Sequence, residues 1–181
     1  MENDNLIETT LESETVFEGK VFDCLVKKVK LCDGSTSRRE IVKHNGGACI
    51  LPVDSENNAY VVRQFRSPFE RVLMEVPAGK LEKDEDPRVC AIRELKEETG
   101  FVSENVVSLG SMVCSPGYCS EVIGLFMATD LKYEGAAPDE GEFLNVEKIP
   151  FSELLKMVEN NEIEDAKSQI CILKAARRLG L

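Results

Sequence analysis

The sequence is poor in imidazole: it has one histidine, His44, and no tryptophan among its 181 residues. A single histidine cannot supply an imidazole-rich zinc site or an HExxH helix, and it limits Ser–His and Cys–His nucleophile pairs to this one position. The glycine-rich phosphate loop GxxxxGK[ST] is also missing. These absences narrow the chemistry toward reactions that need neither imidazole nor a nucleophilic side chain.

Basic residues are scarce as well, with 22 Lys and Arg against 33 Asp and Glu, which gives a formal net charge of −11. This balance argues against nucleic-acid backbones and anionic membranes as partners. It also repels any phosphate-bearing substrate, which would need bound Mg²⁺ and nearby arginines. The 43% hydrophobic content is enough for one core. We therefore expect a main domain over residues 46–181 with a β appendage over residues 1–45.

No targeting or membrane segment is visible in the sequence. The opening stretch MENDNLIETTLESE lacks the basic and apolar regions of a signal peptide, and no hydrophobic run approaches the ~20 residues of a membrane span. Seven cysteines are scattered without a CxxC pair. We therefore expect free thiols and a reducing cytoplasm.

The most informative stretch is GKLEKDEDPRVCAIRELKEETGF, residues 79–101. Asp86 is a good N-cap, Pro87 a good first helical residue and Gly100 a good C-terminal cap. These signals predict a helix over residues 87–99. At ~100° per residue, the helix places four charged side chains on one face with Cys90, opposite a mainly apolar face. The four are Arg93, Glu94, Glu97 and Glu98.

Clustered carboxylates disfavour an isolated helix by a few tenths of a kcal/mol. A hard divalent cation would compensate for this repulsion, because Mg²⁺ prefers carboxylate oxygen and bridges to substrate phosphates. Arg93 can pair with one carboxylate and fix its rotamer. The alternative is a solvated acidic helix surface that binds nothing.

The rest of the chain is predicted to form strands, turns and two further helices. Residues 1–15 should be frayed, and residues 16–43 should form a hairpin or small sheet around a turn at 33–35. A buried strand at 46–53 should pair with 59–66 as a hairpin, followed by strands at 105–117, 120–130 and 143–146. Ser152 should cap a helix, and a last helix at 163–179 should turn Ile170, Leu173 and Ala176 inward.

Several polar residues stand out next to these elements. Glu75 lies in an apolar strand and needs a partner if it is buried. Arg63 and Arg66 should point to opposite faces of their strand. Pro77 and Gly79 should make a tight turn that frees the Ala78 carbonyl to bind an ion. The loop at 134–142 carries Asp139, Glu140 and Glu142, and its local sequence alone favours an ordinary acidic surface loop.

The central stretch has glycine, five residues, Glu85, seven residues, and then Arg-Glu-apolar-x-Glu-Glu-x-Gly-apolar up to Phe101. In this pattern the sequence resembles the Nudix hydrolases. The segments EVPAG at 75–79 and RQFR at 63–66, the loop at 139–142 and Pro116 are similar to the ADP-ribose pyrophosphatase subgroup. The resemblance implies an α+β fold, an α/β/α sandwich around a mixed sheet, with an N-terminal antiparallel sheet exchanged in a homodimer.

The resemblance also implies roles for individual residues. The Mg²⁺ ligands, with Mn²⁺ possible, would be Glu94, Glu98, the Ala78 carbonyl and, as a ligand or by orienting a water, Glu97. The catalytic base would be Glu142, with Glu140 as the alternative. The substrate contacts, partly across subunits, would be Arg39, Arg66, Glu75 and the Gly117 backbone. Motif positions that support these groups would be Gly79, Glu85, Arg93, Gly100 and Pro116.

The activity implied is Mg²⁺-dependent hydrolysis of ADP-ribose to AMP and ribose 5-phosphate. The motif does not separate ADP-ribose from GDP-mannose, other nucleotide sugars or dinucleotides. Two alternative hypotheses assign the protein no enzymatic activity. It could be a regulator that binds a ligand without catalysis, or an oligomeric structural protein. The N-terminal strands could likewise be a decoration instead of a subunit contact.

Overall fold

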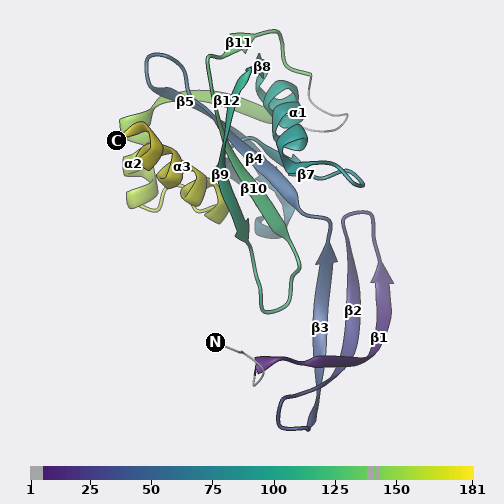
Figure 1. Cartoon of the computed structure of the whole chain (residues 1–181). Helices are drawn as coiled ribbons and strands as arrows, with labels where there is room; N and C mark the ends of the chain where they lie inside the picture. Colours follow the sequence, from purple (N-terminus) through teal and green to yellow (C-terminus); the bar gives the residue numbers. More distant parts are fainter. Residues whose placement is uncertain (1–5, 138–140, 142) are drawn as a thin grey trace. The chain divides into compact units, whose positions relative to one another are not determined.

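The computed structural model describes residues 6–137, 141 and 143–181. The chain forms two compact units (Figure 1). The N-terminal unit comprises Met1–Gly46 and Val113–Glu121, and the main unit comprises Gly47–Met112 and Val122–Leu181.

The N-terminal unit is a three-stranded antiparallel sheet in the order β1-β2-β3. Its strands are β1 (Thr9–Glu18), β2 (Phe22–Lys30) and β3 (Thr36–His44). The predicted turn joins β2 to β3, where Gly34 has a φ of 85° and donates to the Leu31 carbonyl. The expectation that residues 1–15 are frayed is wrong from Thr9 onward, because a polar sequence suits an edge strand whose residues are all exposed.

The main unit is built on a mixed sheet in the order β7-β4-β10-β9, in which β4 and β10 are parallel and β4 and β7 antiparallel. A second sheet has the order β12-β5-β6, and β11 pairs with β8. The bounds are β4 (Gly47–Pro52), β5 (Asn58–Arg66), β6 (Arg71–Glu75), β7 (Ala78–Lys80), β8 (Phe101–Val102), β9 (Asn105–Val113), β10 (Val122–Thr129), β11 (Lys132–Tyr133) and β12 (Leu144–Pro150). A 3-10 turn, η2 (Ser67–Phe69), joins β5 to β6.

The predicted hairpin of 46–53 with 59–66 is wrong. Strands β4 and β5 belong to different sheets, and an isolated bridge between Val53 and Ala59 lies where the chain passes from one strand to the other. Every residue of β4 is buried, and β7 and β10 occupy its two edges. A fully buried strand with both edges paired is central in its sheet, so its sequence neighbour must pair elsewhere.

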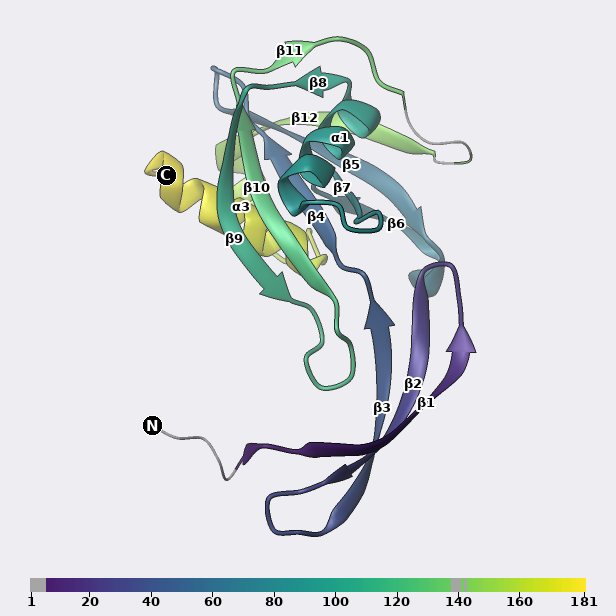
Figure 2. The same cartoon turned by 45° about the vertical axis from the view of Figure 1, so that its right-hand side comes forward.

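Helix α1 (Pro87–Thr99) lies on one side of β4 and β10, and α3 (Ala166–Leu179) lies on the other (Figures 1 and 2). Helix α2 (Phe151–Glu159) packs beside α3. One core cluster fills the space between α1 and the sheet: Ala48, Ile50, Cys90, Ala91, Leu95, Phe126 and Ala128. This arrangement confirms the expected α/β/α sandwich. Within the described residues, no helix has the length and apolarity needed to cross a bilayer.

The two C-terminal helices differ from expectation in detail. Helix α2 begins at Phe151, whose N–H donates to the Asn57 carbonyl and whose ring is buried, so Ser152 is not its cap. Helix α3 buries Cys171, Ile172, Ala175 and Ala176, whereas Ile170 is half-buried and Leu173 is 49% exposed. The buried face of α3 is therefore rotated from the predicted one, and of the three residues expected to face inward only Ala176 is buried.

Candidate active site

Helix α1 begins and ends as its sequence predicts. The Asp86 carboxylate accepts from the Arg88 N–H at 2.8 Å, and Pro87 occupies the first turn, where its missing N–H has no intrahelical partner to lose. Gly100 has a φ of 74° and donates to the Lys96 carbonyl at 2.9 Å, which closes the last turn. These two ends fix which residues of the helix face the sheet.

The start of the 134–142 loop is attached to the C-terminal end of α1. The Gly100 carbonyl accepts from Glu134 N at 2.8 Å, and the Glu97 carbonyl accepts from Ala137 N at 3.1 Å. A Cβ on Gly100 would stand 2.6 Å from Ala136 N, so this contact requires glycine independently of φ. The predicted bases Glu140 and Glu142, and Asp139, lie outside the described residues, and their roles stay predictions.

Two of the α1 carboxylates are buried, which argues against a solvated acidic surface. Glu94 is 7% exposed and Glu98 is 2% exposed, while Glu97 is half-buried. The charged side chains share one face as expected, since Arg93 bonds both Glu94 and Glu97. Burial does not follow this division, because Cys90 packs in the core with Ala91 and the buried part of the helix contains apolar and acidic side chains alike. Buried carboxylates without a strong compensating interaction are costly.

Strand β7 explains why the motif begins with glycine. A Cβ on Gly79 would lie 1.6 Å from Oε1 of Glu94 and 2.1 Å from its carboxyl carbon. The Glu94 carboxylate therefore occupies the space that a side chain at position 79 would need. Gly79 is required for close approach of the helix to the strand and not for an unusual φ.

Ala78 presents its backbone to the same carboxylates. Its N–H donates to Oε2 of Glu98 at 3.1 Å. The predicted tight turn is instead a short strand in register with β4, where Ala78 pairs with Cys49. Because the N–H and C=O of one strand residue point to the same side, the Ala78 carbonyl is directed away from β4 and toward the side of Glu98.

Arg93 joins the remaining acids of the motif. Its guanidinium donates to Glu94 at 2.7 Å, to Glu97 at 2.8 Å and to Glu85 at 3.2 Å. The hydrogen bond to Glu85 is the largest of several contacts that raise the pKa of Arg93, and the same contact lowers the pKa of Glu85. One cation thus offsets part of the repulsion among three carboxylates.

A second charged cluster lies on β5, β6 and the start of α3. Glu75, 2% exposed, accepts from Arg66 Nε at 2.6 Å and Nη2 at 2.7 Å, and also from Lys167 Nζ. Burial raises the pKa of Glu75, but the two cations outweigh it and hold this pKa below its usual value. The expectation that a buried Glu75 needs a partner is confirmed. Arg63 instead pairs with Glu147 at 2.5 Å.

The family comparison fits this geometry: the model of the NUDIX domain matches residues 43–169. The chain belongs to the NUDIX family. The match covers α1, every strand of the main unit and the first residues of α3, so the resemblance seen in the sequence is confirmed.

Relatives of this NUDIX protein carry more than one name. An "ADP-ribose pyrophosphatase" from Bacillus subtilis (strain 168) is 42% identical over 170 residues, 93% of this chain and 92% of the relative. A "Methanol dehydrogenase activator" from Bacillus methanolicus is 41% identical over 167 residues, 91% of this chain and 90% of the relative. A "GDP-mannose pyrophosphatase" from Enterobacter sp. (strain 638) is 36% identical and covers 75% of each chain.

The fold has a close counterpart among solved structures. A chain titled "Crystal structure of ADP compounds hydrolase" superimposes with a TM-score of 0.85, covers 97% of this chain and 96% of the other, and is 22% identical. At this identity the likeness shows the fold alone.

Members of the NUDIX family generally use divalent metal ions. The donor set on α1 and β7 fits a hard cation: it consists of the Glu94, Glu97 and Glu98 carboxylates and the Ala78 carbonyl, all oxygen. In the described part of the chain, no three His, Cys, Asp or Glu side chains form a ready-made metal site. Arg93 bonds Glu94 and Glu97, so metal binding would require these two side chains to exchange partners.

The residues predicted outside the NUDIX helix are divided between the units. Arg39, Pro116 and Gly117 belong to the N-terminal unit. Arg39 pairs with Glu8 through Nε at 3.1 Å and through Nη2. Gly117 lies in a turn at 115–119 and has open space around its Cα. Their substrate roles stay predictions.

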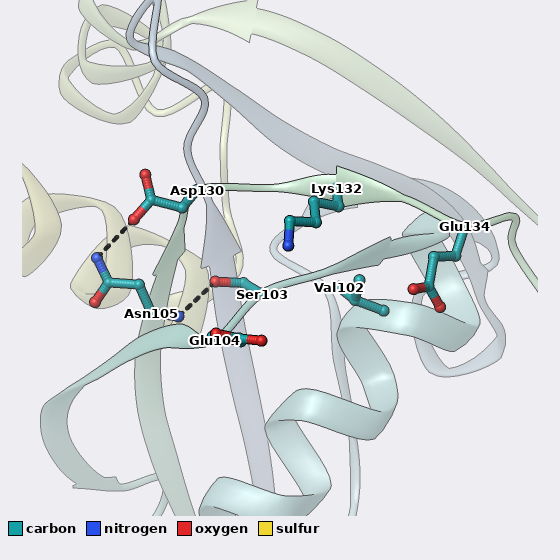
Figure 3. A pocket seen from close by; sticks show the side chains of 7 residues that line it. All are labelled: Val102, Ser103, Glu104, Asn105, Asp130, Lys132 and Glu134. Carbon is teal, nitrogen blue, oxygen red and sulfur yellow. Dashed lines mark hydrogen bonds between the residues drawn. The ribbon is translucent and has the colours of Figure 1, made fainter.

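A separate pocket of about 580 Å³ lies between β8, β11 and the ends of β9 and β10 (Figure 3). It contains no residue of the NUDIX motif or of the Glu75 cluster. Asn105 donates to Asp130 at 3.1 Å across one edge of it. Its lining is Val102, Ser103, Glu104, Asn105, Asp130, Lys132 and Glu134.

Sequence reasoning missed Lys167, which contacts Glu75. A signal existed, because Lys167 is in the first turn of α3, where the helix dipole disfavours positive charge. A lysine at that place needs a compensating acid. The sequence alone did not show that this acid comes from β6.

Proposed function

We propose that the protein hydrolyses the pyrophosphate bond of ADP-ribose to give AMP and ribose 5-phosphate, with Mg²⁺ as its metal and Mn²⁺ as a substitute. The observation that carries this proposal is the pair of buried carboxylates, Glu94 and Glu98, packed against Gly79 and the Ala78 backbone. The ADP-ribose pyrophosphatase relative, similar over 93% of the chain, supports the choice of substrate.

In this mechanism Glu94, Glu98 and the Ala78 carbonyl would hold the metal, and Glu97 would join them or orient a water. When bound, the metal supplies Lewis-acid stabilisation of phosphate charge and lowers the pKa of water. The base that takes the proton of the attacking water is Glu142, with Glu140 as the alternative. Attack at phosphorus depends on positioning and charge stabilisation, which fits a site without a nucleophilic side chain.

Other residues bind the substrate. The contacts to ADP-ribose, partly across subunits, are made by Arg66, Glu75, Arg39 and the Gly117 backbone. Arg93, Glu85, Gly79, Gly100 and Pro116 support these groups. A homodimer is supported by β1, which exposes ten consecutive residues, among them Leu11 at 48%, Val16 at 55% and Phe17 at 53%. Seven free cysteines support a reducing cytoplasm.

The test is a panel of ADP-ribose, GDP-mannose, other nucleotide sugars and a dinucleotide, each with Mg²⁺, with Mn²⁺ and with chelator, read by product identity. We expect AMP and ribose 5-phosphate from ADP-ribose and loss of turnover with chelator. The Glu98→Gln variant should lose turnover, and Glu159→Gln, an exposed residue of α2, should keep it. ADP-ribose binding without turnover at saturating Mg²⁺ would contradict the proposal and indicate a regulator.

A second candidate substrate is GDP-mannose, because a relative covering 75% of the chain bears that activity in its name. The two candidates share the pyrophosphate and differ in base and sugar. GMP and mannose 1-phosphate as the preferred products of the panel would favour this alternative over ADP-ribose while keeping the roles of the α1 carboxylates.

A further inference from the structure

One buried carboxylate, Glu75, is shared by two cations from different elements. Arg66 on β5 bonds both of its oxygens with Nε and Nη2, which leaves Nη1 unused by Glu75. Lys167 on α3 bonds Oε2 as well, and its side chain is 12% exposed. A single carboxylate is neutralised by one cation, so the charge of the second must be balanced by another acid.

Lys167 is also bound by the residue that caps the N-terminus of α3. Its Nζ lies 3.0 Å from Oδ2 of Asp165, the N-cap of α3. The same Asp165 oxygen accepts from Ser168 N at 2.9 Å and from Ser168 Oγ at 2.5 Å, and Ser168 Oγ accepts from Val76 N at 2.8 Å. The first turn of α3 thereby fixes the segment that follows Glu75.

The charges of this group balance only when Lys167 is present. Arg66 and Lys167 are positive, and Glu75 and Asp165 are negative. Without Lys167 the Arg66 charge would be cancelled by Glu75 alone, and Asp165 would leave an excess negative charge. This matters at the NUDIX site because Glu75 precedes Ala78 by only three residues, and the Ala78 N–H donates to the Glu98 carboxylate at 3.1 Å.

We infer that Lys167 is a positioning residue: by sharing Glu75 with Arg66 and pairing with Asp165, it orients Arg66 and preserves its attraction for an anionic diphosphate substrate beside Glu98. This inference rests on the proposed function, because it concerns the substrate of that same site. Lys167 acts through Glu75 and Arg66 and does not itself touch the substrate. Its removal should therefore change substrate affinity more than the chemical step.

The test compares Michaelis kinetics of purified full-length variants on the substrate that the wild type turns over. Lys167→Met should raise KM about tenfold and change kcat less than about threefold, because breaking a buried charge contact weakens binding. Lys167→Arg, which keeps the charge, should restore most of the affinity. The matched control is Lys174→Met, an exposed lysine of the same helix that donates to the Leu109 carbonyl, and it should keep the wild-type KM.

Asp165→Asn tests the sign of the effect. Asparagine caps a helix as well as aspartate does, so α3 should keep its start while the group gains a net positive charge. KM should fall or stay at the wild-type value, opposite to the change in Lys167→Met. This variant also serves if Lys167→Met fails to fold, which thermal unfolding would reveal.

Two sets of results are distinguishable. If the wild type hydrolyses no compound of the panel, the proposed function is wrong. If the wild type is active but folded Lys167→Met keeps its KM, or Asp165→Asn raises KM as much as Lys167→Met does, only the role of Lys167 is wrong.

Discussion

Strand β1 exposes all ten of its residues, apolar ones included, whereas helix α1 buries two of its charged ones, Glu94 and Glu98. Each arrangement is unfavourable for a chain in water by itself, in the first case because apolar surface is wetted and in the second because carboxylates are desolvated. We propose that each is relieved further from outside the chain, by a protein surface at β1 and by a cation with its substrate at α1. Exposed apolar residues therefore indicate a protein partner, and buried carboxylates indicate a cation.

The largest expected effect is at the buried acids. Glu98→Gln should lower kcat/KM about 10³-fold or more, because it removes a charge that the metal site requires. The variant should fold normally, since the glutamine oxygen can still accept from Ala78 N. Activity and thermal unfolding measured together would check this, and turnover equal to the wild type would refute the role of α1.

A smaller loss of activity is expected when α1 can no longer pack closely against β7. Gly79→Ala places a methyl group where the Glu94 carboxylate lies, so Glu94 must swing away. We expect kcat/KM to fall about 10- to 100-fold, the range seen when a metal ligand loses its orientation. Raising the metal concentration should recover part of the activity. If Gly79→Ala keeps the wild-type kcat/KM, the position of Glu94 does not need to be fixed.

The exposed strand gives a test in the other region. Leu11→Glu should dissociate a homodimer held through β1, observed as a halved mass in sedimentation or light scattering. Leu173→Glu on α3 is the matched control, because Leu11 and Leu173 are 48% and 49% exposed. If both variants keep the wild-type mass, or if the wild type is a monomer, β1 does not hold a dimer.

The smallest effect concerns stability at the Asp54 turn. Burial raises the pKa of Asp54, but Lys148 and the Asn58 and Glu56 backbone outweigh it and lower this pKa in the folded state. A lowered folded pKa gives stability that is present above the unfolded pKa, near 3.9, and lost as the pH falls through the folded value. Asp54→Asn should cost about 0.5–1 kcal/mol at pH 7 after screening. Denaturant titrations at pH 7 and pH 2 should show the difference shrinking at the lower pH.

The sequence predicts those features that depend on local chemistry. The caps of α1, the turn at 33–35 and the fold implied by the NUDIX pattern all follow from short segments whose residue types have few other uses. Glu75 could be singled out for the same reason, as an acid among apolar residues. These signals do not depend on which distant segment lies beside them.

Features that depend on distant pairing are not predicted. The sequence could not indicate that β4 pairs with β7 and β10 instead of β5, since any of these apolar strands fits a buried edge. Strand β1 was missed because an exposed edge strand lacks the alternating pattern that marks a half-buried one. Lys167 and the three-way contact of Arg93 likewise arise from elements far apart in the chain or from rotamers that the sequence does not fix.

The most direct measurement is Mn²⁺ binding to the wild type and to Glu98→Gln, followed by electron paramagnetic resonance in the presence of a non-hydrolysable ADP-ribose analogue. The account predicts tight Mn²⁺ binding to the wild type and a loss of about 10-fold or more in affinity in the variant. Equal Mn²⁺ binding by both proteins would contradict the claim that the buried α1 carboxylates hold the metal.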